Sequence, residues 1–253
     1  MKFVGSIIGF LLLLYLIAGL ALFLLQRSYI YYPTEEVSHD FTDKLIDVSG
    51  GNTLKVIVVN ELMEDAVIYF GGNSESVALS AGAYSVTLPD KTIYMVNYRG
   101  YGGSEGQPTE ENLFNDAVSI FDVISENHKN ISVIGRSLGS GVGNWLATQR
   151  PVDKLVLITP YDSILELARS TYPIFPVSLL MKDKFNSVEY AASINVPVLA
   201  ILAENDNLIP AENSHRLIAA FNHDVEVSVI RGAIHNNVQE NVEFYPLIGE
   251  FLQ

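Results

Sequence analysis

The chain contains no cysteine and few basic residues. Without cysteine there are no disulfide bonds and no thiolate metal sites, and a chain without thiols suits either redox compartment. The 15 Lys and Arg residues stand against 29 Asp and Glu, which gives a net charge of −14. This balance argues against a nucleic-acid partner and against electrostatic binding to anionic lipid.

The chain has enough apolar residues for one large domain. It has 253 residues, of which 49% are hydrophobic, so a core can form without covalent cross-links. We find no internal repeat and no low-complexity tract. The composition therefore predicts a single domain of the α/β type.

The longest hydrophobic run lies at the N-terminus. Residues 3–25 carry no charge, and at about 1.5 Å per residue a helix of this length spans roughly 34 Å, enough to cross the hydrocarbon of a bilayer. A cleaved signal peptide is the alternative, but the run is long for one and its small-residue site, Gly19-Leu20-Ala21, lies inside the run. We expect residues 1–27 to be a single-pass transmembrane anchor, with residues 28–253 as the catalytic domain.

The charges around this run indicate its orientation. Lys2 and the terminal amine precede it and Arg27 follows it, which favours a catalytic domain on the periplasmic, extracytoplasmic or lumenal side. Tyr29, Tyr31 and Tyr32 come next and fit either an interfacial aromatic belt or ordinary core positions.

Beyond Pro33, strand and helix patterns alternate. Short β-branched or apolar runs separated by turn residues predict strands; they cover residues 53–59, 66–70, 92–96, 132–134, 154–158, 198–202 and 226–230. A helix begins after Pro108-Thr109, with one apolar stripe reaching Ile124. This alternation predicts a mostly parallel sheet flanked by helices. Residues 163–192 fit neither period, and we expect them to form a short cap.

The sequence Gly135-Arg136-Ser137-Leu138-Gly139 has the G-x-S-x-G form, in which a serine occupies a sharp turn between a strand and a helix. An apolar run precedes it, and a helix is predicted over residues 138–148. We therefore predict Ser137 as the nucleophile, although a chance turn would have the same pattern.

A serine hydroxyl needs a base, and five histidines are available. His235 follows the last predicted strand, at the carboxyl edge where parallel sheets bind ligands. The other four are expected at the surface; they are His39, His128, His215 and His223. His235 is therefore the predicted base.

The acid that orients this base is expected at the same edge. Asp206 follows the preceding strand. The chain order Ser137, Asp206, His235 is the order of the triad in proteins whose serine lies on a G-x-S-x-G turn between a strand and a helix. Asp162 follows another strand at the same edge, and Glu204 lies beside Asp206. Asp206 is preferred, with Asp162 as its rival.

Two backbone amides should stabilise an oxyanion. Leu138 follows the nucleophile and supplies the first. Gly71-Gly72-Asn73 follows a predicted strand and lets the backbone approach a substrate, so the amide of Asn73, with that of Ser74 close behind, is the predicted second donor. Arg99, in a later turn, is expected either to pair with a carboxylate or to contact substrate.

Taken together, Gly71-Gly72-Asn73, residues 97–106, the serine motif, Asp206 and His235 resemble an α/β-hydrolase of the membrane-anchored serine hydrolase type. The likeness covers nearly the whole chain and implies an eight-stranded sheet with the α/β-hydrolase fold. Many relatives have His-Gly-Asn where this chain has Gly71-Gly72-Asn73, so a side chain that supports the oxyanion loop is missing.

The expected function is cleavage of a carboxylic ester or thioester through an acyl-enzyme, without metal or cofactor. The substrate would be a small or lipid-like acyl ester or thioester, including an acylated protein. The alternatives are a serine peptidase of the same fold and a non-catalytic binding protein.

Overall fold

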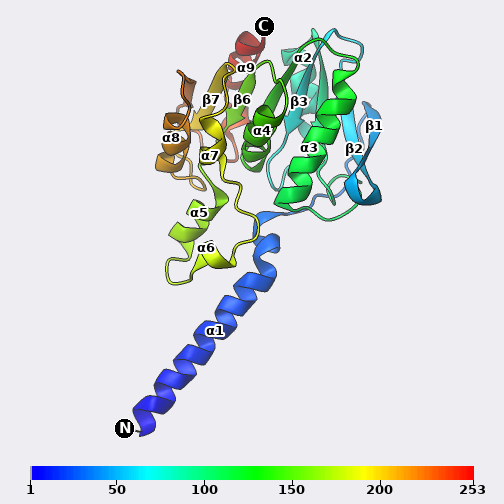
Figure 1. Cartoon of the computed structure of the whole chain (residues 1–253). Helices are drawn as coiled ribbons and strands as arrows, with labels where there is room; N and C mark the ends of the chain where they lie inside the picture. Colours follow the sequence, from blue (N-terminus) through cyan, green and yellow to red (C-terminus); the bar gives the residue numbers. More distant parts are fainter. Residues whose placement is uncertain (1) are drawn as a thin grey trace.

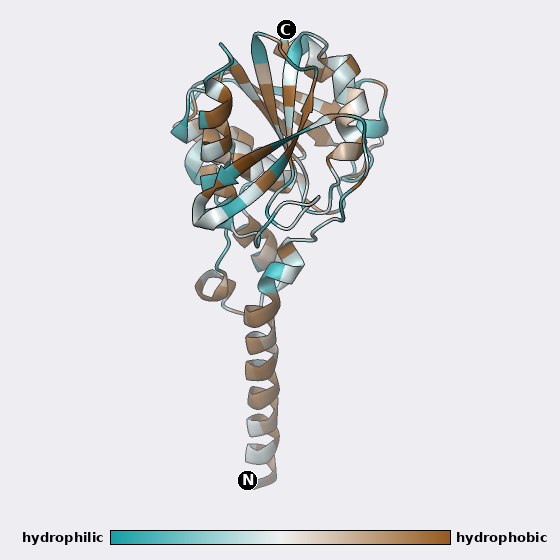
Figure 2. Cartoon of the chain, turned by 90° about the vertical axis from the view of Figure 1, so that its right-hand side faces the viewer, coloured by the Kyte–Doolittle hydropathy of each residue, from teal (hydrophilic) through white to brown (hydrophobic). Residues whose placement is uncertain are grey.

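A computed structural model describes residues 2–253, and its first element is a long helix that projects from the body (Figure 1). This helix, α1, spans Lys2–Ile30. Among the described residues it is the one helix long and apolar enough to cross a membrane, and its most apolar window is not buried by the rest of the chain. Figure 2 shows its hydrophobic colouring along nearly its whole length. The helix continues three residues beyond the expected boundary at residue 27.

The body is built on one eight-stranded sheet with the order β1-β2-β4-β3-β5-β6-β7-β8. The pairs β1–β2 and β2–β4 are antiparallel, and all other neighbours are parallel. The strands span Thr42–Val48, Asn52–Val59, Asp65–Phe70, Lys91–Val96, Ile131–Arg136, Leu155–Ile158, Val198–Ala203 and Glu226–Ile230. The predicted α/β class with a mostly parallel sheet is confirmed.

Helices cover both faces of the sheet. One face packs against α3, α4, α7 and α8, and the other against α2 and α9 (Figure 1). After α1 the α-helices span Ala78–Thr87, Glu110–Ser125, Leu138–Gln149, Ile164–Thr171, Val177–Leu180, Ser187–Ala191, Ala211–Ala219 and Phe244–Leu252. Short 3₁₀ turns occupy Ser49–Gly51 and Val238–Glu240.

Local sequence explains the best-predicted helix, α3. The Thr109 hydroxyl accepts a hydrogen bond from the Asn112 amide, and Glu110 and Glu111 occupy the first turn, where carboxylates favour the positive end of the helix dipole. The apolar stripe of α3 is buried against the sheet. The predicted start and core-facing side of this helix are therefore confirmed.

One strand is absent from the sequence-based set. β1 is an edge strand in which most side chains are exposed; only Ile46 and Val48 are buried. Such a strand lacks the continuous apolar run by which the central strands were recognised. It pairs with β2 along its whole length, which completes the eight strands that the family likeness implied.

Residues 163–192 contain three short helices, α5, α6 and α7. The Ser163 hydroxyl accepts from the Glu166 amide and starts α5, and Pro173 and Pro176 separate it from α6. Helices this short give no usable periodicity, which explains why the pattern of this segment fitted neither helix nor strand.

A buried ion pair joins α3 to the loop after β4. Arg99 Nε and Nη2 donate to the two Asp116 carboxylate oxygens at 2.8 and 2.7 Å, and Nη2 also donates to the Ser49 carbonyl. Burial raises the pKa of Asp116, although the Arg99 guanidinium opposes that shift. The expectation that Arg99 pairs with a carboxylate is confirmed.

The chain offers a matched comparison for this pair. Asp122, also on α3, receives two hydrogen bonds from Arg150, but those side chains are 53% and 31% exposed against 5% for both members of the buried pair. Asp116→Ala leaves a buried guanidinium without its carboxylate, so it should lower the free energy of unfolding by about 3 kcal/mol. Asp122→Ala should cost less than about 1 kcal/mol. Denaturant unfolding of the two purified variants measures the difference, and equal losses would contradict it.

Candidate active site

Ser137 lies at the strand-to-helix junction between β5 and α4. Its backbone has φ +49° and ψ −115°, a combination that costs strain in any residue other than glycine. Gly139 makes the junction possible, because a Cβ atom there would lie 2.1 Å from the Phe70 carbonyl oxygen of β3. The first turn of α4 therefore packs directly on the sheet and presents the Ser137 side chain at its carboxyl edge.

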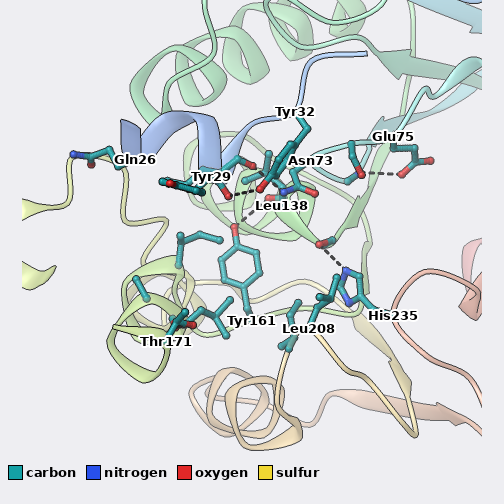
Figure 3. A pocket seen from close by; sticks show the side chains of 18 of the residues that line it. Gln26, Tyr29, Tyr32, Asn73, Glu75, Leu138, Tyr161, Thr171, Leu208 and His235 are labelled. Carbon is teal, nitrogen blue, oxygen red and sulfur yellow. Dashed lines mark hydrogen bonds between the residues drawn. The ribbon is translucent and has the colours of Figure 1, made fainter. Parts of the chain in front are cut away.

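His235 approaches Ser137 from the loop that follows β8. Its Nε2 lies 2.9 Å from Ser137 Oγ, and its Nδ1 lies 2.8 Å from Asp206 Oδ2. The His235 and Asp206 side chains are 6% and 9% exposed. The structure thus brings the three predicted residues into one hydrogen-bonded chain. Figure 3 shows the His235 ring at the wall of the pocket.

Asp206 is held by its own loop as well as by His235. Its Oδ1 accepts from the Leu208 and Ile209 amides at 2.9 and 2.8 Å. Burial acts to raise the pKa of Asp206, but the hydrogen bond from His235 and those two amides outweigh it, and the pKa lies below its ordinary value. The carboxylate is therefore ionised at neutral pH, as a group that stabilises an imidazolium must be.

The rival acids are engaged elsewhere. Asp162 is buried and accepts from the Ser163 amide, Asn213 Nδ2 and Arg216 Nε at 2.7 Å each. Its bonds fasten the loop after β6 to α8. Glu204 accepts from the Gly232 amide at 2.7 Å and so supports the loop that carries His235. Neither carboxylate bonds to the His235 ring in the described part of the chain.

The two predicted oxyanion donors come from two segments that lie near Ser137. Leu138 is the first residue of α4, and its amide is one of those that a helix N-terminus leaves free. Asn73 lies in the loop after β3, where a Cβ atom at Gly72 would be 3.8 Å from that of Ser137. Within residues 2–253 neither amide donates to a protein acceptor.

Surrounding bonds fix the Asn73 loop. The Asn73 carbonyl accepts from the Tyr32 amide and the Tyr101 hydroxyl, and Asn73 Nδ2 donates to the Ile30 carbonyl. The end of α1 is thus bonded directly to the loop that carries the predicted donor.

Glu75 is a site residue that the sequence did not indicate. One carboxylate oxygen accepts from the Gly72 amide at 2.9 Å and lies 3.2 Å from Arg136 Nη1, and the other accepts from the Tyr69 hydroxyl at 2.7 Å. The Glu75 side chain therefore supports the loop that carries the predicted donor Asn73, a support that was expected to be missing in Gly71-Gly72-Asn73. A glutamate two residues past the loop has no recognisable motif, so only the folded structure identifies it.

The remaining histidines lie away from Ser137. His215 is exposed, and His39 and His223 are partly exposed. His128 is partly exposed as well. Its Nε2 bonds to the Tyr94 hydroxyl and its Nδ1 to the Met63 carbonyl. The two bonds of His128 fix the turn after α3 to β4 and to the loop after β2. In residues 2–253 no three His, Asp or Glu side chains cluster in a way that could hold a metal.

A pocket of about 840 Å³ opens beside Ser137 and His235, within the range of roughly 300–1,000 Å³ typical of small-molecule sites. Its walls are mainly aliphatic and aromatic side chains. They come from the cap, from the loop after β7 and from α1 (Figure 3).

The contribution of α1 is the second feature that the sequence did not indicate. Leu22, Phe23, Gln26 and Tyr29 of this helix line the pocket, as does Tyr32 just after it. Tyr31 points the other way and is buried against Phe185. Tyr31 is therefore a core residue, whereas Tyr29 and Tyr32 are exposed and line the pocket.

No protein-family profile matches the chain, but curated proteins do. An uncharacterised protein of Mycobacterium tuberculosis strain H37Rv is 34% identical over 193 residues, 75% of this chain and 65% of that protein. Lysophosphatidylserine lipase ABHD12 of Danio rerio is 31% identical over 145 residues, 49% of this chain and 38% of that protein. Alpha/beta hydrolase domain-containing protein WAV2 of Arabidopsis thaliana is 29% identical over 174 residues, which are 60% of this chain and 56% of that protein. The chain thus matches about two thirds or less of the length of these relatives.

Solved structures share the fold. The esterase Pf2001 of Pyrococcus furiosus superposes with a TM-score of 0.69 at 19% identity, covering 88% of this chain and 96% of the esterase. Mouse alpha/beta hydrolase domain-containing protein 10 gives a TM-score of 0.66 at 16% identity, covering 83% and 96%. With the sheet order and the named relatives, these likenesses show that the chain belongs to the α/β-hydrolase superfamily.

Proposed function

We propose that this chain is a membrane-anchored serine hydrolase that cleaves a carboxylic ester or thioester through an acyl-enzyme on Ser137. The observation that carries the proposal is His235, which lies within hydrogen-bond distance of both Ser137 Oγ and Asp206 Oδ2 at the wall of an apolar pocket. The esterase and lipase named among the similar proteins support ester chemistry.

The geometry supports the following steps. His235 Nε2 takes the Ser137 hydroxyl proton as Oγ bonds to the acyl carbon, and the negative charge on the carbonyl oxygen is stabilised by the Asn73 and Leu138 amides. The bond to the leaving group then breaks, and that group takes the proton from His235. Water next attacks the acyl carbon while His235 Nε2 takes one of its protons. The bond between the acyl carbon and Ser137 Oγ then breaks, and Oγ takes that proton from His235, which releases the acid and restores the Ser137 hydroxyl. This scheme uses no metal or cofactor.

The pocket favours an acyl chain over a peptide. Its walls offer large apolar side chains, and among the described residues none of those that line it belongs to the edge strands β1 and β8, where a peptide could add as a further strand. A small-molecule or lipid-like acyl ester or thioester is therefore the proposed substrate, an acylated protein being one form of it. We place the domain at a membrane, anchored by residues 3–25, on the extracytoplasmic or lumenal side.

Ser137→Ala should abolish labelling by a fluorophosphonate probe, because the reacting oxygen is removed. Ser76 also lines the pocket and provides the matched control. The Ser76→Ala variant should be labelled as strongly as the unmodified chain. Gel fluorescence after labelling measures both, and thermal unfolding checks that each variant is folded. Labelling that survives in Ser137→Ala would assign the nucleophile to another residue.

The two aspartates should differ in their effect on turnover. Asp206→Asn removes the charge that fixes the tautomer of His235, so kcat for a simple ester should fall by about 10⁴. Asp162→Asn disturbs contacts to Asn213 and Arg216 and should lower thermal stability while reducing kcat less than about tenfold. Steady-state kinetics with a chromogenic ester decides the assignment; the reverse order of effects would make Asp162 the triad acid.

Glu75 should act as a positioning residue for the oxyanion loop. Glu75→Ala removes the acceptor for the Gly72 amide, so kcat should fall by about 10- to 100-fold. This reduction does not exceed the fall in kcat that follows removal of one oxyanion donor. KM for a short ester should change little, because the apolar side chains of the pocket wall are retained even though Glu75 itself lines the pocket. Glu75→Gln keeps an acceptor oxygen and should restore most of kcat. A purely structural residue would instead show reduced folded protein with unchanged kcat per active site, titrated with the fluorophosphonate.

A further inference from the structure

The cap carries an exposed apolar segment whose solvent-facing side chains have no partner in the domain. We call residues 172–181 the cap loop; it includes the short helix α6. It contains no charged residue, although Arg169 and Lys182 lie close to its two ends. Ile174 is 71% exposed and Leu179 is 83% exposed. Large apolar side chains concentrated on one short exposed segment mark an interaction surface.

The cap loop is fastened to α1 and not only to the hydrolase body. Tyr15 and Phe175 stack with ring centroids 4.9 Å apart, and the Tyr15 hydroxyl donates to the Ile174 carbonyl at 2.9 Å. The Phe175 ring also packs over Gly19, where it would be in ordinary van der Waals contact, at 3.5 Å, with a Cβ atom. Higher on the helix, Gln26 Nε2 donates to the Leu180 carbonyl at 3.2 Å. Figure 1 shows α6 beside the domain-proximal part of α1.

These contacts set the depth of the loop relative to the apolar part of α1. The uncharged run ends at Leu25, and Tyr15 lies ten residues before it, about 15 Å along the helix axis. A bilayer that covers residues 3–25 has a hydrocarbon core of about 30 Å. A loop stacked on Tyr15 is therefore carried below the polar surface of that bilayer.

Charged groups collect at the level where the surface would lie. Arg27 Nε donates to Asp183 Oδ2 at 2.8 Å, and Lys182 Nζ lies 4.7 Å from the centre of the Phe23 ring. Long basic side chains at the end of a span reach toward the polar headgroups. The end of the apolar part of α1 and the end of the cap loop thus lie at the same level, where these charged side chains would meet the lipid headgroups.

The backbone of the cap loop suits a site without water. Most amides of the loop donate to its own carbonyls, namely those of Phe175, Val177, Leu179, Leu180 and Met181. Pro173 and Pro176 have no amide hydrogen, which leaves the Ile174 and Ser178 amides without an acceptor among residues 2–253. The Ile174 and Leu180 carbonyls accept from α1 side chains. Backbone at membrane depth must be satisfied in this way, by bonds within the protein.

The same two segments line the pocket that reaches Ser137. Leu22 and Phe23 face it from α1, and Phe175, Val177 and Met181 face it from the cap loop. We propose that the cap loop inserts into the bilayer beside α1, and that the acyl chain of a bilayer-resident lipid ester passes between them to Ser137. This inference rests on the proposed hydrolase activity for its substrate, but not for the insertion itself.

Insertion can be measured without activity, because the chain has no cysteine and a single introduced thiol is labelled uniquely. Ile174→Cys and Leu179→Cys, labelled with an environment-sensitive fluorophore, are placed as full-length chains in phosphatidylcholine nanodiscs with or without brominated acyl chains. Leu12→Cys in α1 reports a position inside the bilayer. Leu62→Cys, a 96% exposed residue in the turn between β2 and β3, reports a position in water.

The brominated lipid should quench the labels at positions 174 and 179 nearly as strongly as the label at position 12, and should leave position 62 unquenched. Quenching at 174 and 179 as weak as at 62 would overturn the proposal. An unquenched label at position 12 would also overturn it, because α1 would then not cross the bilayer.

The access path is tested with two esters that share a leaving group. Ile174→Asp combined with Leu179→Asp should lower hydrolysis of p-nitrophenyl palmitate in phosphatidylcholine vesicles by at least about tenfold, and leave hydrolysis of water-soluble p-nitrophenyl butyrate unchanged. Leu62→Asp, the matched control, should change neither rate. An equal loss for both esters would overturn the proposed path. If the unmodified chain hydrolyses neither ester while positions 174 and 179 are quenched, the hydrolase activity fails and the insertion stands.

Discussion

The close approach of α4 to the sheet is the constraint on which the site depends. Gly139 lies against the Phe70 carbonyl with no room for a side chain, and Gly135 is equally crowded by the backbone of Gly139 and Ser140. Because the helix cannot move outward without losing this contact, Ser137 must absorb the change of direction in an unfavourable backbone conformation. Its hydroxyl, the Leu138 amide and the edge of β3 are then fixed relative to one another before any substrate binds.

Other site groups are positioned against that fixed point by loops from neighbouring strands. β7 supplies Asp206 and β8 supplies His235, and Glu204 bonds to the Gly232 amide between them. On the other side, Glu75 joins the Gly72 amide to Arg136, the residue directly before Ser137. Each loop is therefore braced by a carboxylate that is not in the candidate triad. Such bracing keeps donors and acceptors oriented without rearrangement, which is where electrostatic catalysis gains most.

The sequence predicted the parts of this arrangement that depend on local chemistry. A serine between glycines, a histidine after the last strand and an acidic residue after the preceding one are recognisable because each backbone position demands a particular residue type. β1 escaped because an exposed edge strand has little apolar pattern. The roles of Glu75 and of α1 in the pocket wall were not predicted for a different reason. They arise from contacts between segments far apart in the chain, which no rule of residue spacing encodes.

The apolar helix shows how composition alone can mislead about a segment's role. Its 29 residues have the composition of a simple anchor, yet its last two turns bond to the cap and to the Asn73 loop, and they form one side of the pocket. A tether attached through a flexible linker would leave the domain free to rotate above the membrane. Here the Ile30 carbonyl is held by Asn73 and the Tyr31 ring is buried in the core, so the helix axis has a fixed direction relative to Ser137. For the proposed membrane anchor, packing alone would therefore set how the candidate site is oriented to the bilayer, and no charge attraction from a chain of net charge −14 is needed.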